Sequence, residues 1–131
     1  MAIRVVVKSI RPNNSTNWYN RDGNIWRPHS AFNAISKSVN SSNPSTFVER
    51  RHPDDLTMIR TYSWPNLSTY NAAIGDYDTS SNSAWKTYAD ALGTYEESNN
   101  ITTIRYIYDA SNNLTSTQRR VRKVYWENYS E

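Results

Sequence analysis

The stretch Ser45–Pro65, STFVERRHPDDLTMIRTYSWP, decides the fold of this chain. It holds two strand patterns, Ser45–His52 and Leu56–Trp64, which are rich in β-branched and aromatic residues. The residues between them, His52–Asp55 (HPDD), carry the proline and aspartates that favour a tight turn. The stretch therefore predicts a β-hairpin. Pro65 ends the hairpin, because proline is tolerated at the start of a helix and not inside a strand ladder.

The residues before the hairpin predict a strand, a long loop and a short helix. Ile3–Ile10 has apolar residues on both faces, which is typical of a central strand. Arg11–Asn24 is polar and unusually long for a loop, and it contains Trp18 and Tyr19, which we expect to anchor it to the body of the protein. Pro28–Val39 has apolar residues three and four positions apart and predicts a helix.

The residues after the hairpin predict two helices and two strands. A short helix follows Pro65 and ends at Gly75, a natural C-terminal capping residue. A longer helix is indicated by Trp85, Tyr88, Ala89, Leu92 and Tyr95, which recur at helical spacing. Ile101–Tyr108 predicts a strand, and the alternation over Thr117–Trp126 predicts one extra antiparallel strand.

This order, β-α-β-β-α-β with an added strand, predicts a ferredoxin-like α+β fold. The helices are expected on one face of an antiparallel sheet. With 131 residues, the chain is expected to form a single domain over residues 1–131. The hydrophobic fraction is 37% with five Trp and ten Tyr, so aromatic side chains supply much of the expected core. Dimerisation is a plausible source of further burial for so small a core.

Composition excludes several classes of site. The chain has no cysteine, which rules out disulfides and thiolate chemistry, and its three glycines are too scattered for a phosphate-binding loop. The two histidines, His29 and His52, lie far apart without carboxylates at ligand spacing, so we expect no metal and no cofactor. No serine has a recognisable histidine and acid partner, and hydrolase or kinase chemistry has no support.

The charge pattern makes a nucleic-acid partner improbable. The net charge is +3, and the basic run Arg119–Lys123 would divide between both faces of a strand, as on many edge strands. Its use as a phosphate track beside Tyr125 and Trp126 is the alternative. An RNA-recognition motif has the same topology, but Leu56–Trp64 lacks the two glycines of its signature. The absence of a signal-peptide core and of a long apolar run predicts a cytoplasmic protein without a membrane segment.

A candidate site lies between the second hairpin strand and the long helix. Arg60 stands in the middle of the bulkier stripe of its strand, so a Tyr- and Trp-rich cover would surround a cation that needs a partner. A ligand carboxylate or phenolate could supply it. Alternatively, the stripe faces solvent or a dimer partner, and Arg60 either pairs with a glutamate or extends its charged end to the surface. The predicted ligand-binding residues are Arg60, Tyr62, Trp64, Trp85 and Tyr88.

The passage Tyr62-Ser63-Trp64-Pro65, which leads into Leu67, resembles the dimeric α/β-barrel branch of the ferredoxin-like fold. Within it, the chain is similar to small proteins of the antibiotic-biosynthesis-monooxygenase type over about residues 3–108. The resemblance implies a homodimer with two facing sheets and one pocket per subunit. In the cofactor-independent oxygenases of this group, Trp, Tyr, Asn and Arg side chains bind an aromatic substrate. Only Trp64 is placed here by the motif.

Two functions follow as expectations. The first is a small homodimer that binds a small apolar or aromatic anion, with cofactor-independent oxygenase-like chemistry as one use of that site. The second is a non-catalytic assembly subunit, for example of a virion, which uses its aromatic surfaces for contacts. No catalytic residue is predicted, and the sequence leaves open whether the protein is an enzyme.

Overall fold

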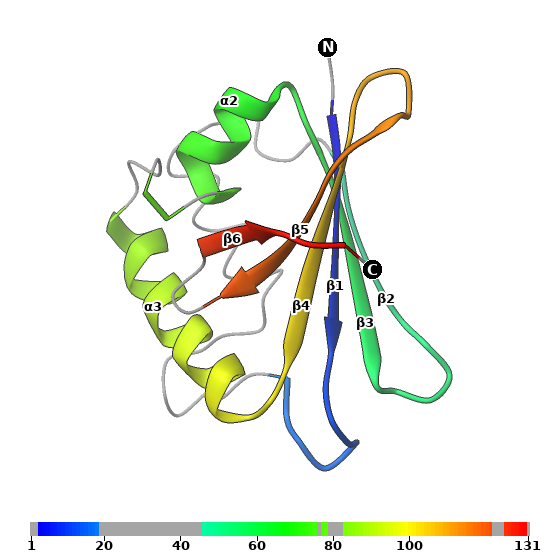
Figure 1. Ribbon diagram of the computed structural model, residues 1–131, viewed down its shortest axis with the longest axis vertical. Helices are drawn as coiled ribbons and strands as arrows, with labels where there is room; N and C mark the ends of the chain where they lie inside the picture. The colour runs from blue at the N-terminus through cyan, green and yellow to red at the C-terminus, as the bar shows by residue number, and fades with distance from the viewer. Residues whose placement is uncertain (1–2, 19–45, 76, 79–82, 122–124, 131) are drawn as a thin grey trace.

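The protein, seen in a computed structural model, pairs an antiparallel sheet with helices on one side (Figure 1). The structure describes residues 3–18, 46–75, 77–78, 83–121 and 125–130. The chain therefore belongs to the α+β class, with α2 (Leu67–Tyr70) and α3 (Ser83–Ser98) on the same side of the sheet. Among the described helices, none has the length and apolar character to cross a membrane. The strands are β1 (Ile3–Ile10), β2 (Thr46–Arg51), β3 (Thr57–Trp64), β4 (Thr102–Tyr108), β5 (Leu114–Val121) and β6 (Tyr125–Asn128).

The sheet has the strand order β2-β3-β1-β4-β5-β6, and every neighbouring pair is antiparallel. β1 is central, as its two apolar faces predicted, and its Val5 pairs with Tyr62 on one side and Ile107 on the other. Consequently β1 and β2 run in the same direction with β3 between them. The predicted helix Pro28–Val39 lies outside the described residues, so the first crossover stays a prediction.

The hairpin of β2 and β3 is built as its turn residues predicted. The Asp55 N–H donates to the carbonyl of His52 at 2.9 Å, and Asp54 Oδ1 accepts the Leu56 N–H at 3.0 Å. Asp55 has a φ of 58°, a left-handed conformation that Asp tolerates better than most residues. Short polar side chains thus hold the turn and fix the register of β3.

The crossover from β3 to β4 contains α2, a π-helical turn η1 (Asn71–Gly75) and α3. Asn66 caps α2, since its Oδ1 accepts the Thr69 N–H at 2.8 Å. The helical segment after Pro65 ends at Gly75 as predicted, but Gly75 has no positive φ and so does not form the left-handed cap that glycine often forms at this position. Glycine is needed there for space: a Cβ on Gly75 would lie 2.6 Å from the ring of Tyr70.

The predicted extra antiparallel strand is present as β5, but its extent over Thr117–Trp126 is wrong, because β5 ends at Val121 and a second strand, β6, follows. Val121 pairs with Tyr125, so the chain reverses between them. The sequence has no glycine or proline at this reversal, and the alternating pattern of a strand continues through it. The pattern therefore predicts one strand. The reversal brings β6 back along β5 on the side where the helices lie (Figure 1).

The core lies between the sheet and the helices. Burial alternates strictly along β3, where every second residue from Met58 to Trp64 is buried. A second, smaller cluster joins Trp18 to Met58 and Ile101, so Trp18 anchors its loop as predicted, while Tyr19 lies outside the described residues. The main cluster contains Val5, Val7, Tyr62, Trp64, Tyr70, Trp85, Tyr88, Ala89, Leu92 and Ile107.

Candidate functional site

The five residues predicted as a site lie together. Tyr62 and Trp64 of β3 belong to the same packed cluster as Trp85 and Tyr88 of α3, and the Trp85 and Tyr88 rings are 5.8 Å apart. Arg60 shares the buried face of β3 and is 1% exposed. The stripe therefore faces α3, and the alternative in which it faces solvent is wrong. All five side chains are at most 6% exposed, so they form a closed core. Their role in ligand binding stays a prediction.

Burial sets the protonation state of the two tyrosines in this core. Removal from water raises the pKa of Tyr62 and of Tyr88 well above the ordinary value, and the nearby Arg60 guanidinium offsets only part of the effect. Both residues are therefore neutral phenols at physiological pH. They can donate a hydrogen bond to an anion, but they cannot act as a phenolate base.

A chain of hydrogen bonds leads from Arg60 across the sheet. Arg60 Nη2 donates to Ser9 Oγ at 3.0 Å, and Ser9 Oγ lies 2.9 Å from Thr103 Oγ1. Thr103 Oγ1 donates to Glu96 Oε2 at 3.0 Å. Because Ser9 accepts from Arg60 and Thr103 donates to Glu96, the Ser9 hydroxyl is left to donate to Thr103. In the β2–β3 register, Glu49 stands opposite Arg60.

The chain of hydrogen bonds ends in a buried ion pair between α3 and β5. Arg120 Nη1 donates to Glu96 Oε1 at 2.8 Å, and the two side chains are 4% and 8% exposed. Such a pair is stable only when further hydrogen bonds satisfy both groups. Glu96 has these, because each of its oxygens accepts one hydrogen bond. Arg120 does not: in the described part of the chain its Nε is buried and has no hydrogen-bond partner.

Sequence reasoning missed Glu96 and Arg120 as candidate site residues. Glu96 lies four residues after Leu92 and eight after Tyr88. That spacing puts it on the buried face of α3, and it was the available signal. Arg120 belongs to the basic run Arg119–Lys123, which we expected to divide between both faces of a strand. The same alternation places Arg120 on the face opposite Arg119, and this face is the inward one.

The basic run divides between the two faces of β5, as expected for a strand. Arg119 pairs with Glu127 of β6, and these two side chains are 44% and 49% exposed. Arg120 points to the helices, where it pairs with Glu96. Both described arginines of the run thus have carboxylate partners on opposite faces, which does not favour a phosphate track. Arg122 and Lys123 lie outside the described residues.

Trp126 of β6 lies between two buried guanidinium groups. The guanidinium carbons of Arg105 and Arg120 are 4.3 and 5.1 Å from the centre of its ring. Within the described part of the chain, Arg105 donates only to neutral acceptors, which are the Gly75 carbonyl at 2.7 Å, the Tyr70 hydroxyl and the Gln118 side chain. Around Trp126 the described residues thus bring together two cations and one carboxylate, that of Glu96.

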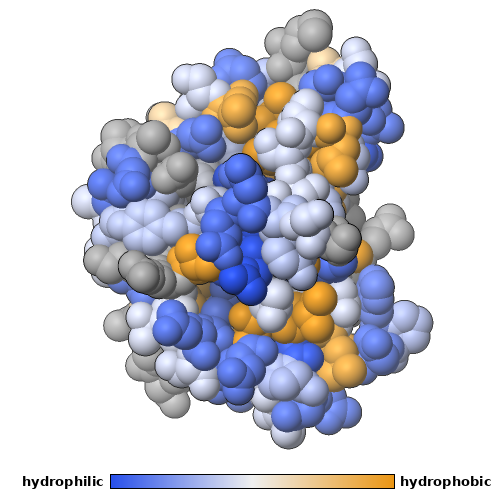
Figure 2. All heavy atoms as spheres, viewed as in Figure 1, coloured by the Kyte–Doolittle hydropathy of each residue, from blue (hydrophilic) through white to orange (hydrophobic). Residues whose placement is uncertain are grey.

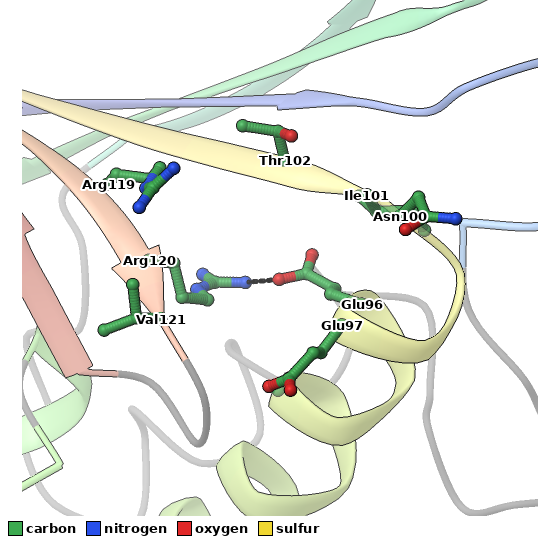
Figure 3. Close-up of a pocket in the computed structure, with 9 residues that line it drawn as sticks. Glu96, Glu97, Asn100, Ile101, Thr102, Arg119, Arg120 and Val121 are labelled. Carbon is green, nitrogen blue, oxygen red and sulfur yellow. Dashed lines mark hydrogen bonds and ion pairs between the residues drawn. The ribbon is translucent and has the colours of Figure 1, made fainter.

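A pocket of about 330 Å³ opens beside the Glu96–Arg120 pair (Figure 3). It lies where the C-terminal end of α3 meets β4 and β5, and Figure 3 shows the ion pair spanning it from helix to strand. None of the five predicted site residues lines it. The lining residues are Gly93, Glu96, Glu97, Asn100, Ile101, Thr102, Arg119, Arg120 and Val121.

Within the described ranges, no group of three or more His, Asp or Glu side chains is arranged to hold a metal ion. No family model, no curated protein and no solved structure matches the chain.

Proposed function

We propose that this chain is a small homodimeric ferredoxin-like protein that binds a small apolar or aromatic anion between α3 and the sheet. The observation that carries the proposal is the Arg120 guanidinium, which lines the pocket and holds a buried Nε–H with no acceptor among the described residues. A buried donor left without a partner costs roughly 1–3 kcal/mol. A ligand carboxylate or phenolate toward which the Arg120 side chain turned would accept from this donor and remove that cost.

The lining of the pocket fits such a ligand. Arg120 lies on the β5 side with its guanidinium on the buried face, whereas the Arg119 guanidinium pairs with Glu127 on the exposed face. A guanidinium recognises a carboxylate through parallel N–H donors. Ile101, Val121 and Gly93 supply an apolar surface for the body of the ligand. The volume of about 330 Å³ is at the lower end of the range for small-molecule sites. We therefore place the ligand's charged group at Arg120.

The site residues predicted from the sequence lie in the core next to this pocket and hold its helix and strands together. Trp85 and Tyr88 pack α3 onto the sheet, and the hydrogen-bond chain connects Arg60 to Glu96. In the proposal, Arg60, Tyr62 and Trp64 form the inner end of the site, which an aromatic ligand would reach by displacing core side chains. The neutral phenols of Tyr62 and Tyr88 would then donate to an anion.

The strand order supports the ferredoxin-like part of the proposal. β1 and β2 run parallel with β3 between them, and β3 and β4 run parallel with β1 between them, which is the arrangement that a split βαβ unit produces. The sheet face away from the helices carries half-buried Val6, Ile10 and Ile59. We propose this face for the contact between two copies.

The alternative, a non-catalytic assembly subunit, would use broad apolar surfaces. In Figure 2, the apolar residues on the displayed face form separate patches that hydrophilic side chains interrupt. Assembly interfaces are typically more continuous than this. Native mass spectrometry of the purified protein distinguishes the two functions, since a dimer with a co-purified small anion supports ligand binding and a higher oligomer supports assembly.

The binding site is tested by calorimetric titration with benzoate as the probe. Arg120→Lys keeps the charge next to Glu96 but removes the guanidinium fork, and Arg119→Lys is the matched control on the exposed face. We expect Arg120→Lys to weaken binding about tenfold or more and Arg119→Lys to leave it nearly unchanged. Arg60→Lys tests the inner end. Equal affinities in the wild type and in Arg120→Lys would overturn the proposed site. Oxygen consumption with bound ligand tests oxygenase-like turnover.

A further inference from the structure

The end of α3 gives the pocket a second, acidic side. The last turn of this helix holds Glu96 and Glu97 and no basic residue. Helix C-termini carry a partial negative charge and prefer cations, so two carboxylates there are unfavourably placed. Arg120 compensates Glu96. In the described structure no cation compensates Glu97, whose side chain is exposed and lines the pocket.

The two unsatisfied groups lie on opposite walls of one pocket. Figure 3 shows Glu97 reaching from α3 toward the side where β5 lies, below the Glu96–Arg120 pair. Arg120 offers a buried Nε–H donor from β5. Among the described residues the Glu97 side chain has no hydrogen bond, while its backbone carbonyl accepts the Asn100 N–H at 3.4 Å. The pocket is thus lined by a guanidinium with one unused donor, which a small turn of the Arg120 side chain would expose, and by the Glu97 carboxylate.

We infer that the ligand of this pocket is a zwitterion of amino-acid size, with its carboxylate on Arg120 and its ammonium group on Glu97. This inference rests on the proposed function, which requires only the carboxylate. It adds the ammonium group, because a simple anion would leave Glu97 uncompensated and would place further negative charge beside it. The apolar body of the ligand would lie on Ile101 and Val121.

Three compounds with one shared carbon skeleton test the inference: phenylalanine, hydrocinnamate, which lacks the amino group, and phenethylamine, which lacks the carboxylate. We expect phenylalanine to bind about two- to fivefold more tightly than hydrocinnamate, as an ion pair with an exposed carboxylate would contribute. Phenethylamine should bind more weakly than phenylalanine as well. Glu97→Gln should lower the affinity for phenylalanine to that of hydrocinnamate and leave hydrocinnamate binding unchanged.

The outcomes separate the two claims. If hydrocinnamate binds as tightly as phenylalanine and Glu97→Gln changes neither affinity, the zwitterion is refuted and the anion site stands. If neither acid binds to the folded wild-type protein, both claims fail. Glu97 is exposed, so Glu97→Gln is expected to fold, and thermal denaturation followed by circular dichroism checks this.

Discussion

The substitution Thr103→Val tests the hydrogen-bond chain that links the core to the pocket. Valine keeps the shape of threonine and its preference for a strand but removes the hydroxyl group. The Thr103 hydroxyl donates to Glu96 at 3.0 Å and lies 2.9 Å from Ser9 Oγ, and the residue is 1% exposed. The substitution therefore removes two buried hydrogen bonds with little change in packing.

The expected cost follows from the two bonds. A hydrogen bond to a charged acceptor contributes about 1.5–3 kcal/mol and a neutral one about 1 kcal/mol, so Thr103→Val should lower the free energy of unfolding by about 2.5–4 kcal/mol. The neighbouring substitution Thr102→Val is the matched control. Thr102 is exposed on the same strand, and its replacement should change stability by less than about 0.5 kcal/mol.

Urea denaturation of the wild type and both variants measures these differences. If Thr103→Val lowers the free energy of unfolding no more than Thr102→Val does, the claim that the hydrogen-bond chain is intact and fully buried is refuted. The variant Ser9→Ala extends the test. Because Ser9 and Thr103 share one hydrogen bond, the double variant should cost less than the sum of the two single variants.

Three further predictions concern the surroundings of the site. Gly75→Ala should lower the free energy of unfolding by about 1–3 kcal/mol, because its Cβ would lie 2.6 Å from the Tyr70 ring; an unchanged urea midpoint would contradict this. Trp126→Leu should cost about 1 kcal/mol more than Trp126→Phe, since only the latter keeps an aromatic face for the two guanidinium groups; equal midpoints would argue against that contact. Burial raises the pKa of Tyr62 and Tyr88 above the ordinary 10.0, so the unfolded state loses these protons first as pH rises. Stability should therefore fall above about pH 10, by about 1.4 kcal/mol per pH unit for each of the two tyrosines, and an equally steep fall in Tyr62→Phe would contradict this assignment.

The hairpin, the central strand and the helix face were predictable because each depends on a local pattern. Turn residues mark the ends of β2 and β3, and the alternation over Met58–Trp64 gives the buried face of β3. The division of Thr117–Trp126 into two strands was not predictable in this way. A single strand and a tight hairpin bury the same alternating residues, and the contact that requires the reversal, Trp126 against Arg105, joins residues 21 apart.

The candidate site was predicted in part. The sequence indicates that Arg60 and the aromatic stripe of β3 meet the face of α3, because both periodicities point inward. It does not indicate whether space remains between them, since packing depends on how far the helix stands from the sheet. The pocket lies instead beside Arg120 and Glu96, a pair separated by 24 positions, and its charge balance is visible only once the fold is known.

The most direct test of the central claim is the nuclear magnetic resonance signal of the Arg120 Nε–H group during titration with benzoate, assigned by its loss in Arg120→Lys. Anion binding at this donor should shift the signal in a saturable manner, because the group gains its first hydrogen-bond acceptor. The Nε–H signal of Arg119, which already donates to Glu127 at 3.2 Å, should stay nearly constant. A constant Arg120 signal at concentrations where calorimetry detects binding would contradict the proposed site.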